Sequence, residues 1–156
     1  LPRALGGEQE KKRRAGTEAV PLIAAFGAAV QALPDLREQD AHFRRLLGRL
    51  LDGLKGRDEV ILHRPAAAVP YIVSLSVPGL RSETLLHFLS ERGVMVSSGS
   101  ACAKGAKSPV LTALSLPARE IDSALRISFC RDNTEDDIDR LLAGLQEAWN
   151  TLAHVR

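Results

Sequence analysis

Apolar side chains recur every three or four residues in several stretches of the chain, the spacing that places them on one face of a helix. This pattern predicts helices over residues 17–33, 36–54, 82–92 and 134–152, with Pro34 ending the first. Thr17 is a plausible cap for that first helix, and Pro21 suits its first turn. Thr134 and Asp137 approximate a capping box before the last helix. The last helix has the clearest apolar stripe, formed by Ile138, Leu141, Leu142, Leu145, Trp149 and Leu152.

Short apolar or alternating runs between these helices predict strands over residues 60–63, 71–77, 94–96 and 124–129, and Pro109 begins a helical turn that extends to Leu114. In the second predicted helix, Arg44, Arg45 and Arg49 lie opposite a leucine stripe and are expected to face solvent. The order of these elements predicts a small α/β fold in which helices pack on a sheet.

Composition narrows the class of protein. The chain has 156 residues, 45% of them hydrophobic, enough for one compact domain plus an appendage. A formal net charge of +2 argues against a general binder of polyanions, so we expect no nucleic-acid partner. There is no apolar run of about 18 residues to predict a membrane partner, and the two cysteines form no disulfide framework, which favours a reducing cytoplasm. The chain begins at Leu1 and its only methionine is Met95, so we expect a fragment.

Cys102 is the first candidate for chemistry. It lies in the polar, glycine-containing run Val96-Ser97-Ser98-Gly99-Ser100-Ala101-Cys102-Ala103-Lys104-Gly105. A structural cysteine usually has bulky apolar neighbours, which this run lacks. Lys104 and Lys107 follow closely, and nearby positive charge raises the fraction of a thiol present as thiolate. The surroundings favour a reactive cysteine over a packing one.

Arg126 and Thr17 each allow two interpretations, one functional and one purely structural. Arg126 stands in an apolar strand, where it either faces solvent beside a surface carboxylate or anchors a substrate carboxylate through two parallel hydrogen bonds. Thr17 is either a helix cap or a phosphate ligand, the second reading helped by the positive charge of Arg13 and Arg14.

The second cysteine and the histidines are not expected to take part in chemistry. Cys130 is expected to be a packing residue. The four histidines, His42, His63, His87 and His154, lack the spacing of metal ligands, so no metal is assigned.

Three separated motifs occur together in one order along the chain. They are Gly6-Gly7-Glu8-Gln9-Glu10-Lys11-Lys12-Arg13-Arg14-Ala15-Gly16-Thr17, the run from Ser97 to Cys102, and Ala124-Leu125-Arg126-Ile127-Ser128 followed by residues 133–139. Together they resemble the cysteine desulfurases, pyridoxal-phosphate enzymes of fold type I within the class V aminotransferases. The resemblance implies that residues 1–35 are the tail of a large cofactor domain and residues 36–156 a small carboxy-terminal domain.

The resemblance also implies a reaction and a set of roles. Cys102 would attack the sulfur of L-cysteine bound to pyridoxal 5'-phosphate, releasing L-alanine and leaving a persulfide for iron–sulfur cluster assembly or thiolation. Arg126 matches the family's substrate-carboxylate arginine. Thr17 matches a residue that reaches the cofactor phosphate of the neighbouring subunit, which implies a homodimer. The expected partners are L-cysteine and a sulfur-acceptor or iron–sulfur scaffold protein.

The chain also departs from the family pattern. The lysine that anchors the cofactor lies upstream of the first motif in the family, so the fragment alone is expected to be inactive. Glu8, Lys12 and Cys130 stand where the family usually has glycine. Two other functions stay open: a non-catalytic module that accepts sulfur or dimerises, and a related lyase acting on selenocysteine.

Overall fold

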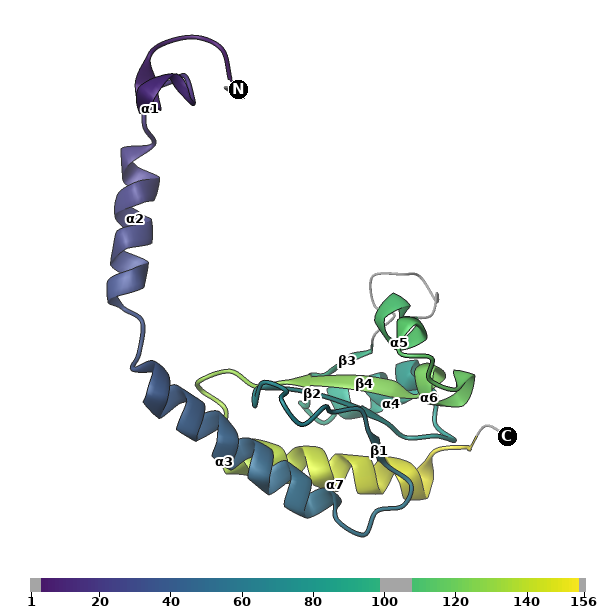
Figure 1. Ribbon diagram of the computed structural model, residues 1–156. Coiled ribbons are helices and arrows are strands. Elements are labelled where there is room, and N and C mark those ends of the chain that lie inside the picture. The colour runs from purple at the N-terminus through teal and green to yellow at the C-terminus, as the bar shows by residue number, and fades with distance from the viewer. Residues whose placement is uncertain (1–3, 99–107, 155–156) are drawn as a thin grey trace. The chain divides into compact units, whose positions relative to one another are not determined.

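The computed structural model describes residues 4–98 and 108–154. The chain divides into two units, Leu1–Leu36 and Arg37–Arg156. Figure 1 shows the elements, which run in the order α1 (Gln9–Lys12), α2 (Val20–Gln31), α3 (Leu36–Leu54), β1 (Ile61–Leu62), β2 (Ile72–Ser76), α4 (Ser82–Ser90), β3 (Ser97–Ser98), α5 (Pro109–Ala113), α6 (Ala118–Asp122), β4 (Ala124–Ser128) and α7 (Glu135–Thr151).

The strands form one sheet in the order β1-β2-β4-β3, and every neighbouring pair is antiparallel. In the central pair, Val73 lies opposite Ile127 and Leu75 opposite Leu125. These side chains are buried on one face of the sheet, because successive residues of a strand point to opposite faces. The mixed α/β fold expected from the sequence is confirmed.

Helices α3, α4 and α7 cover the buried face with their apolar stripes (Figure 1). The helix-borne core consists of Phe43, Leu46, Leu47, Leu50, Leu54, Leu85, Leu89, Ile138, Leu141, Leu142, Leu145 and Ala148. Helix α3 has the predicted bounds, and its Arg44, Arg45 and Arg49 are exposed, as expected. Arg49 forms an ion pair with Asp139 of α7 at 2.8 Å, and this guanidinium lowers the pKa of Asp139.

The termini of two helices follow the sequence signals closely. Thr134 and Asp137 form the predicted capping box at the start of α7, where the Thr134 backbone N–H donates to Asp137 Oδ2 at 2.9 Å. Gly93 has a φ of 75° after α4, a conformation that glycine adopts readily. Because the Val94 amide donates back to the Leu89 carbonyl, Val94 continues the helix end and does not begin a strand. The strand predicted over 94–96 is therefore wrong, and pairing begins at Ser97.

The first unit differs from expectation at Thr17, which does not cap α2. The helix begins at Val20, and Ala19 is the residue at the N-cap position. Pro21 explains the shift, because a proline has no N–H to donate to the carbonyl four residues earlier and its ring clashes with that group, which here belongs to Thr17. The short α1 and α6 have no counterpart in the sequence prediction. Lys12 has a φ of 64°, the left-handed region, at a position where the resemblance expected glycine.

Candidate functional site

Arg126 lies at the middle of β4 on the sheet face opposite α3, α4 and α7, which we call the outer face. The outer face carries Ile72, Ser74 and Ser76 from β2 and Ala124, Arg126 and Ser128 from β4. Arg126 is exposed, while its neighbours Leu125 and Ile127 point into the core. Within residues 4–98 and 108–154 its guanidinium makes no side-chain hydrogen bond or ion pair. A rigid strand therefore presents a cation with donors available to a ligand.

Thr17 belongs to the first unit and Cys102 to the undescribed residues, so neither is placed relative to Arg126. Thr17 is exposed in the first unit, where Arg14 donates to its carbonyl oxygen at 3.0 Å. Its hydroxyl makes no hydrogen bond with the described residues, which leaves it available as a donor. Cys102 lies outside the described residues, between Ser98 at the end of β3 and Ser108 at the start of α5.

Cys130 is exposed, so the expectation of a packing cysteine is wrong. Alternation along β4 explains this result. Residues 126, 128 and 130 are all exposed, whereas Ile127 and Phe129 enter the core. The backbone N–H of Cys130 donates to Asn133 Oδ1 at 2.8 Å, which fixes the turn that leads into α7.

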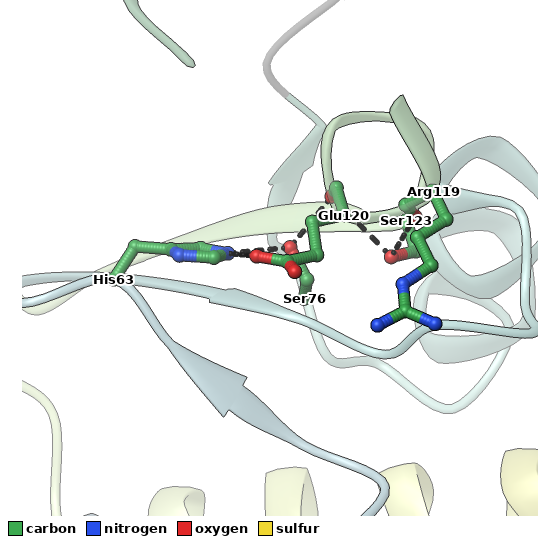
Figure 2. Close-up of polar contacts among 5 residues, drawn as sticks. All are labelled: His63, Ser76, Arg119, Glu120 and Ser123. Atoms are coloured by element: carbon green, nitrogen blue, oxygen red, sulfur yellow. Dashed lines mark hydrogen bonds and ion pairs between the residues drawn. The ribbon is translucent and has the colours of Figure 1, made fainter. Parts of the chain in front are cut away.

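Sequence reasoning missed a polar network at one end of the outer face, drawn in Figure 2. Ser76 is fully buried there, and its hydroxyl donates to the Glu120 carbonyl of α6 at 2.6 Å. His63 Nε2 lies 2.7 Å from the same hydroxyl oxygen and 4.0 Å from Glu120 Oε2. Ser123 Oγ donates to the Arg119 carbonyl at 2.8 Å, at the carboxyl end of α6. The network attaches α6 to the sheet.

The same contacts settle which nitrogen of His63 carries hydrogen. A carbonyl oxygen only accepts, so the single hydroxyl hydrogen of Ser76 belongs to the bond with Glu120. His63 Nε2 must then donate to Ser76 Oγ. The signal available in the sequence was the polar alternation Ser74-Leu75-Ser76, which indicates an outer face but not what covers it.

The described residues fit one part of a pyridoxal-phosphate site. The hydroxyl of Thr17 is free to meet a phosphate oxygen, with Arg13 and Arg14 nearby in sequence. The described lysines, Lys11, Lys12 and Lys55, are all exposed, and Lys12 and Lys55 pair with Glu8 and Asp52. None of these three is buried as a desolvated, reactive lysine would be.

The described part of the chain contains neither a candidate metal site nor a candidate membrane-spanning helix. No group of three or more His, Cys, Asp or Glu side chains is placed to hold a metal ion. No helix there has the length and apolar character needed to cross a membrane.

Comparison with known proteins gives the family. Residues 4–141 match the model for aminotransferase class-V proteins. The chain is 37% identical over 146 residues to the cysteine desulfurase IscS of Methanosarcina thermophila and 38% identical over 144 residues to that of Clostridium botulinum. It covers 36% of the length of each, with 91% and 88% of this chain aligned.

The fold comparison agrees with the sequence comparison. An X-ray structure of a NifS-like protein from Rickettsia africae superposes with a TM-score of 0.77 at 29% identity. The match covers 97% of this chain and 40% of that one. A second solved structure, also a NifS-like protein, gives a TM-score of 0.74 at 32% identity. Since the family model spans most of the chain and the fold matches independently, this chain belongs to the aminotransferase class-V family.

Proposed function

We propose that this chain is the carboxy-terminal part of a cysteine desulfurase, which converts L-cysteine to L-alanine and a persulfide on Cys102. The observation that carries the proposal is Arg126, an exposed guanidinium on a strand, without an ion pair among the described residues. A planar guanidinium binds a carboxylate through two parallel hydrogen bonds, which suits an amino acid substrate. The relatives named cysteine desulfurase support the choice of substrate.

The reaction divides between this chain and its cofactor. The Cys102 thiolate attacks the sulfur of L-cysteine, so that a sulfur–sulfur bond forms and the carbon–sulfur bond of the substrate breaks. The electron pair of the broken bond stays on the substrate carbon, which takes up a proton to give L-alanine, and Cys102 keeps the sulfur as a persulfide. Pyridoxal 5'-phosphate, when bound, supplies the electron sink for this cleavage. Arg126 holds the substrate carboxylate, and Thr17 donates to the cofactor phosphate of the neighbouring subunit.

The proposed domain division is supported by α2. We assign residues 1–35 to the tail of a large cofactor domain and residues 36–156 to the small domain that bears Cys102. Helix α2 has no buried residue, even though it is rich in large apolar side chains. More than half of the surface is exposed at Val20, Leu22, Ile23, Phe26 and Val30. A helix that is apolar on all sides is typical of a protein interior. The intact homodimer would cover it, and the anchoring lysine would come from outside this chain.

The fate of the persulfide sulfur and the activity of the chain alone complete the proposal. The persulfide sulfur would pass to an acceptor or scaffold protein for iron–sulfur cluster assembly or thiolation, in the cytoplasm. The chain alone is expected to be inactive, because the family's cofactor-anchoring lysine lies upstream of the first motif.

The test measures alanine and sulfide formed from L-cysteine with added pyridoxal phosphate, comparing this chain with the intact gene product that contains it. Activity is expected only in the intact protein. Turnover by neither would favour a non-catalytic module that accepts sulfur or dimerises. Turnover by the chain alone would show that the expected upstream lysine is not needed. A comparison of L-cysteine with L-selenocysteine separates a desulfurase from a selenocysteine lyase.

Variants of the intact protein test the two roles. Cys102→Ser should abolish sulfide release and leave cofactor binding unchanged. Arg126→Ala should raise the KM for L-cysteine. Arg131→Ala is the matched control, because Arg131 is exposed just beyond β4 and contacts Asp132 at 3.6 Å. An unchanged KM in Arg126→Ala would remove that residue from the site.

A further inference from the structure

A row of polar residues crosses β3, β4 and β2 at the level of Arg126 and ends at His63, just beyond β1. Arg126 lies opposite Ser74 of β2 on one side and Ser97 of β3 on the other. The next residue of the row is His63, whose backbone N–H donates to the Ser74 carbonyl at 2.9 Å. Residues opposite one another across a sheet point to the same face. Arg126 is therefore flanked by a serine on each side.

The hydrogen-bond pattern places Ser74 closer to Arg126 than the register alone indicates. Phe129 N–H donates to the Tyr71 carbonyl, and Val77 N–H donates to the Ser123 carbonyl. Both bonds join residues that lie opposite one another, so the hydrogen-bonded pairs fall at odd-numbered positions of β2 and β4. Ser74 and Arg126 form a non-hydrogen-bonded pair, in which the Cα atoms lie about 4.5 Å apart and side chains approach closest.

The hydroxyl of Ser74 also differs from those of Ser76, Ser97 and Ser123. Ser76 and Ser123 donate to carbonyl oxygens of α6, and Ser97 Oγ donates to the Ser98 carbonyl at 3.3 Å. Ser74 Oγ makes no hydrogen bond within the described residues, and the side chain is half-buried. A free hydroxyl thus lies beside a guanidinium whose donors are also unused by the described residues.

We propose that Ser74 is a second substrate-binding residue, whose hydroxyl donates to the same carboxylate that Arg126 holds. This inference rests on the proposed function. A carboxylate has two oxygens with about four acceptor sites, so two guanidinium N–H groups and one hydroxyl can all be accommodated. The hydroxyl bond is assisted by the charge of the carboxylate. Ser74 would thereby favour substrates that carry an α-carboxylate over amines that lack one.

The experiment uses the intact enzyme with its cofactor. It compares competitive inhibition of alanine formation by S-methyl-L-cysteine and by 2-(methylthio)ethylamine, which is the same molecule without its carboxylate. The variants are Ser74→Ala, Ser74→Thr, which keeps a hydroxyl, and Ser128→Ala. Ser128 is the matched control, because it is an exposed outer-face serine of β4 in the adjacent row, opposite Ile72.

Ser74→Ala should raise the inhibition constant of S-methyl-L-cysteine by about tenfold, the effect of one hydrogen bond to a charged group. The constant for 2-(methylthio)ethylamine should stay unchanged, Ser74→Thr should restore most of the affinity, and Ser128→Ala should match the wild type. Equal effects on both inhibitors, or none, would overturn the role of Ser74 while leaving that of Arg126 intact. Absence of alanine formation by the wild type would overturn the proposed function and this inference with it.

Discussion

Ser76→Ala removes the hydroxyl at the centre of the network that attaches α6 to the sheet. The side chain is fully buried and joins His63 Nε2 at 2.7 Å to the Glu120 carbonyl at 2.6 Å. Its loss leaves His63 Nε2 without this acceptor and leaves the Glu120 carbonyl only the longer bond from Ser123 Oγ at 3.3 Å. The side chains of His63 and Glu120 are only 7% and 12% exposed there. Leaving one buried polar group unpaired costs about 1–3 kcal/mol. We expect the free energy of unfolding to fall by about 2–3 kcal/mol, since the remaining groups relax partly toward one another.

Urea unfolding followed by the fluorescence of Trp149, the single tryptophan of the chain, measures this change. With a denaturant slope of about 1.5 kcal/mol per molar, the midpoint should fall by roughly 1.3–2 M at unchanged slope. Ser128→Ala is the control, because it makes the same atomic change on the same sheet face at an exposed position and should alter stability by no more than about 0.5 kcal/mol. Equal midpoints for the two variants would refute the network as a source of stability.

Four further predictions concern α3, α7 and the end of β4. Gly48→Ala in α3 should stabilise the chain by about 0.5–1 kcal/mol in the same urea assay, because alanine is the better helix former and a Cβ there meets nothing within 4 Å. Gly144→Ala in α7 should instead destabilise it by about 1 kcal/mol, because the new Cβ would lie 2.7 Å from Leu89 Cδ2 in the core; a gain in stability would show that Leu89 moves aside freely. Hydrogen bonds from the Thr134 backbone and the Asn133 side chain lower the pKa of Asp137. Its carboxylate therefore stabilises the fold at any pH above the unfolded pKa of about 3.9. This stabilisation is lost as the pH falls through the lower pKa of the folded state. Asp137→Asn should therefore be less stable than wild type at neutral pH, with a difference that shrinks in acid titration; a constant difference would exclude the ionised cap. Because Cys130 is exposed, it should react with a thiol reagent in the native Cys102→Ser variant as fast as after unfolding, and protection would contradict its position.

The sequence predicts best what depends on neighbours along the chain. The leucine stripe of α3 and the capping box of α7 use contacts within a few residues, and both are confirmed. The same local rules could have shown that Thr17 is not a helix cap. Pro21 stands four residues later and excludes a helix that begins at Thr17.

The outer-face network depends on contacts that spacing does not reveal. Ser76 and Glu120 are 44 residues apart, and α6 between the cysteine run and β4 has no apolar periodicity long enough to predict a helix. The wrong prediction that Cys130 is a packing residue has a related cause. Burial frequencies average over both faces of a strand, whereas the alternation of buried and exposed residues along β4 continues to Cys130.

The sheet order β1-β2-β4-β3 has a consequence for how this part of the family can vary. The chain leaves the sheet after Ser98 and returns at Ala124 directly beside the strand it left. The distance between Ser97 and Arg126 is therefore set by backbone pairing and not by the length of the connection that contains Cys102. With the roles proposed for Cys102 and Arg126, insertions or deletions in that connection would change which acceptor the thiol meets without moving the arginine. Sulfur delivery and substrate recognition could then evolve independently.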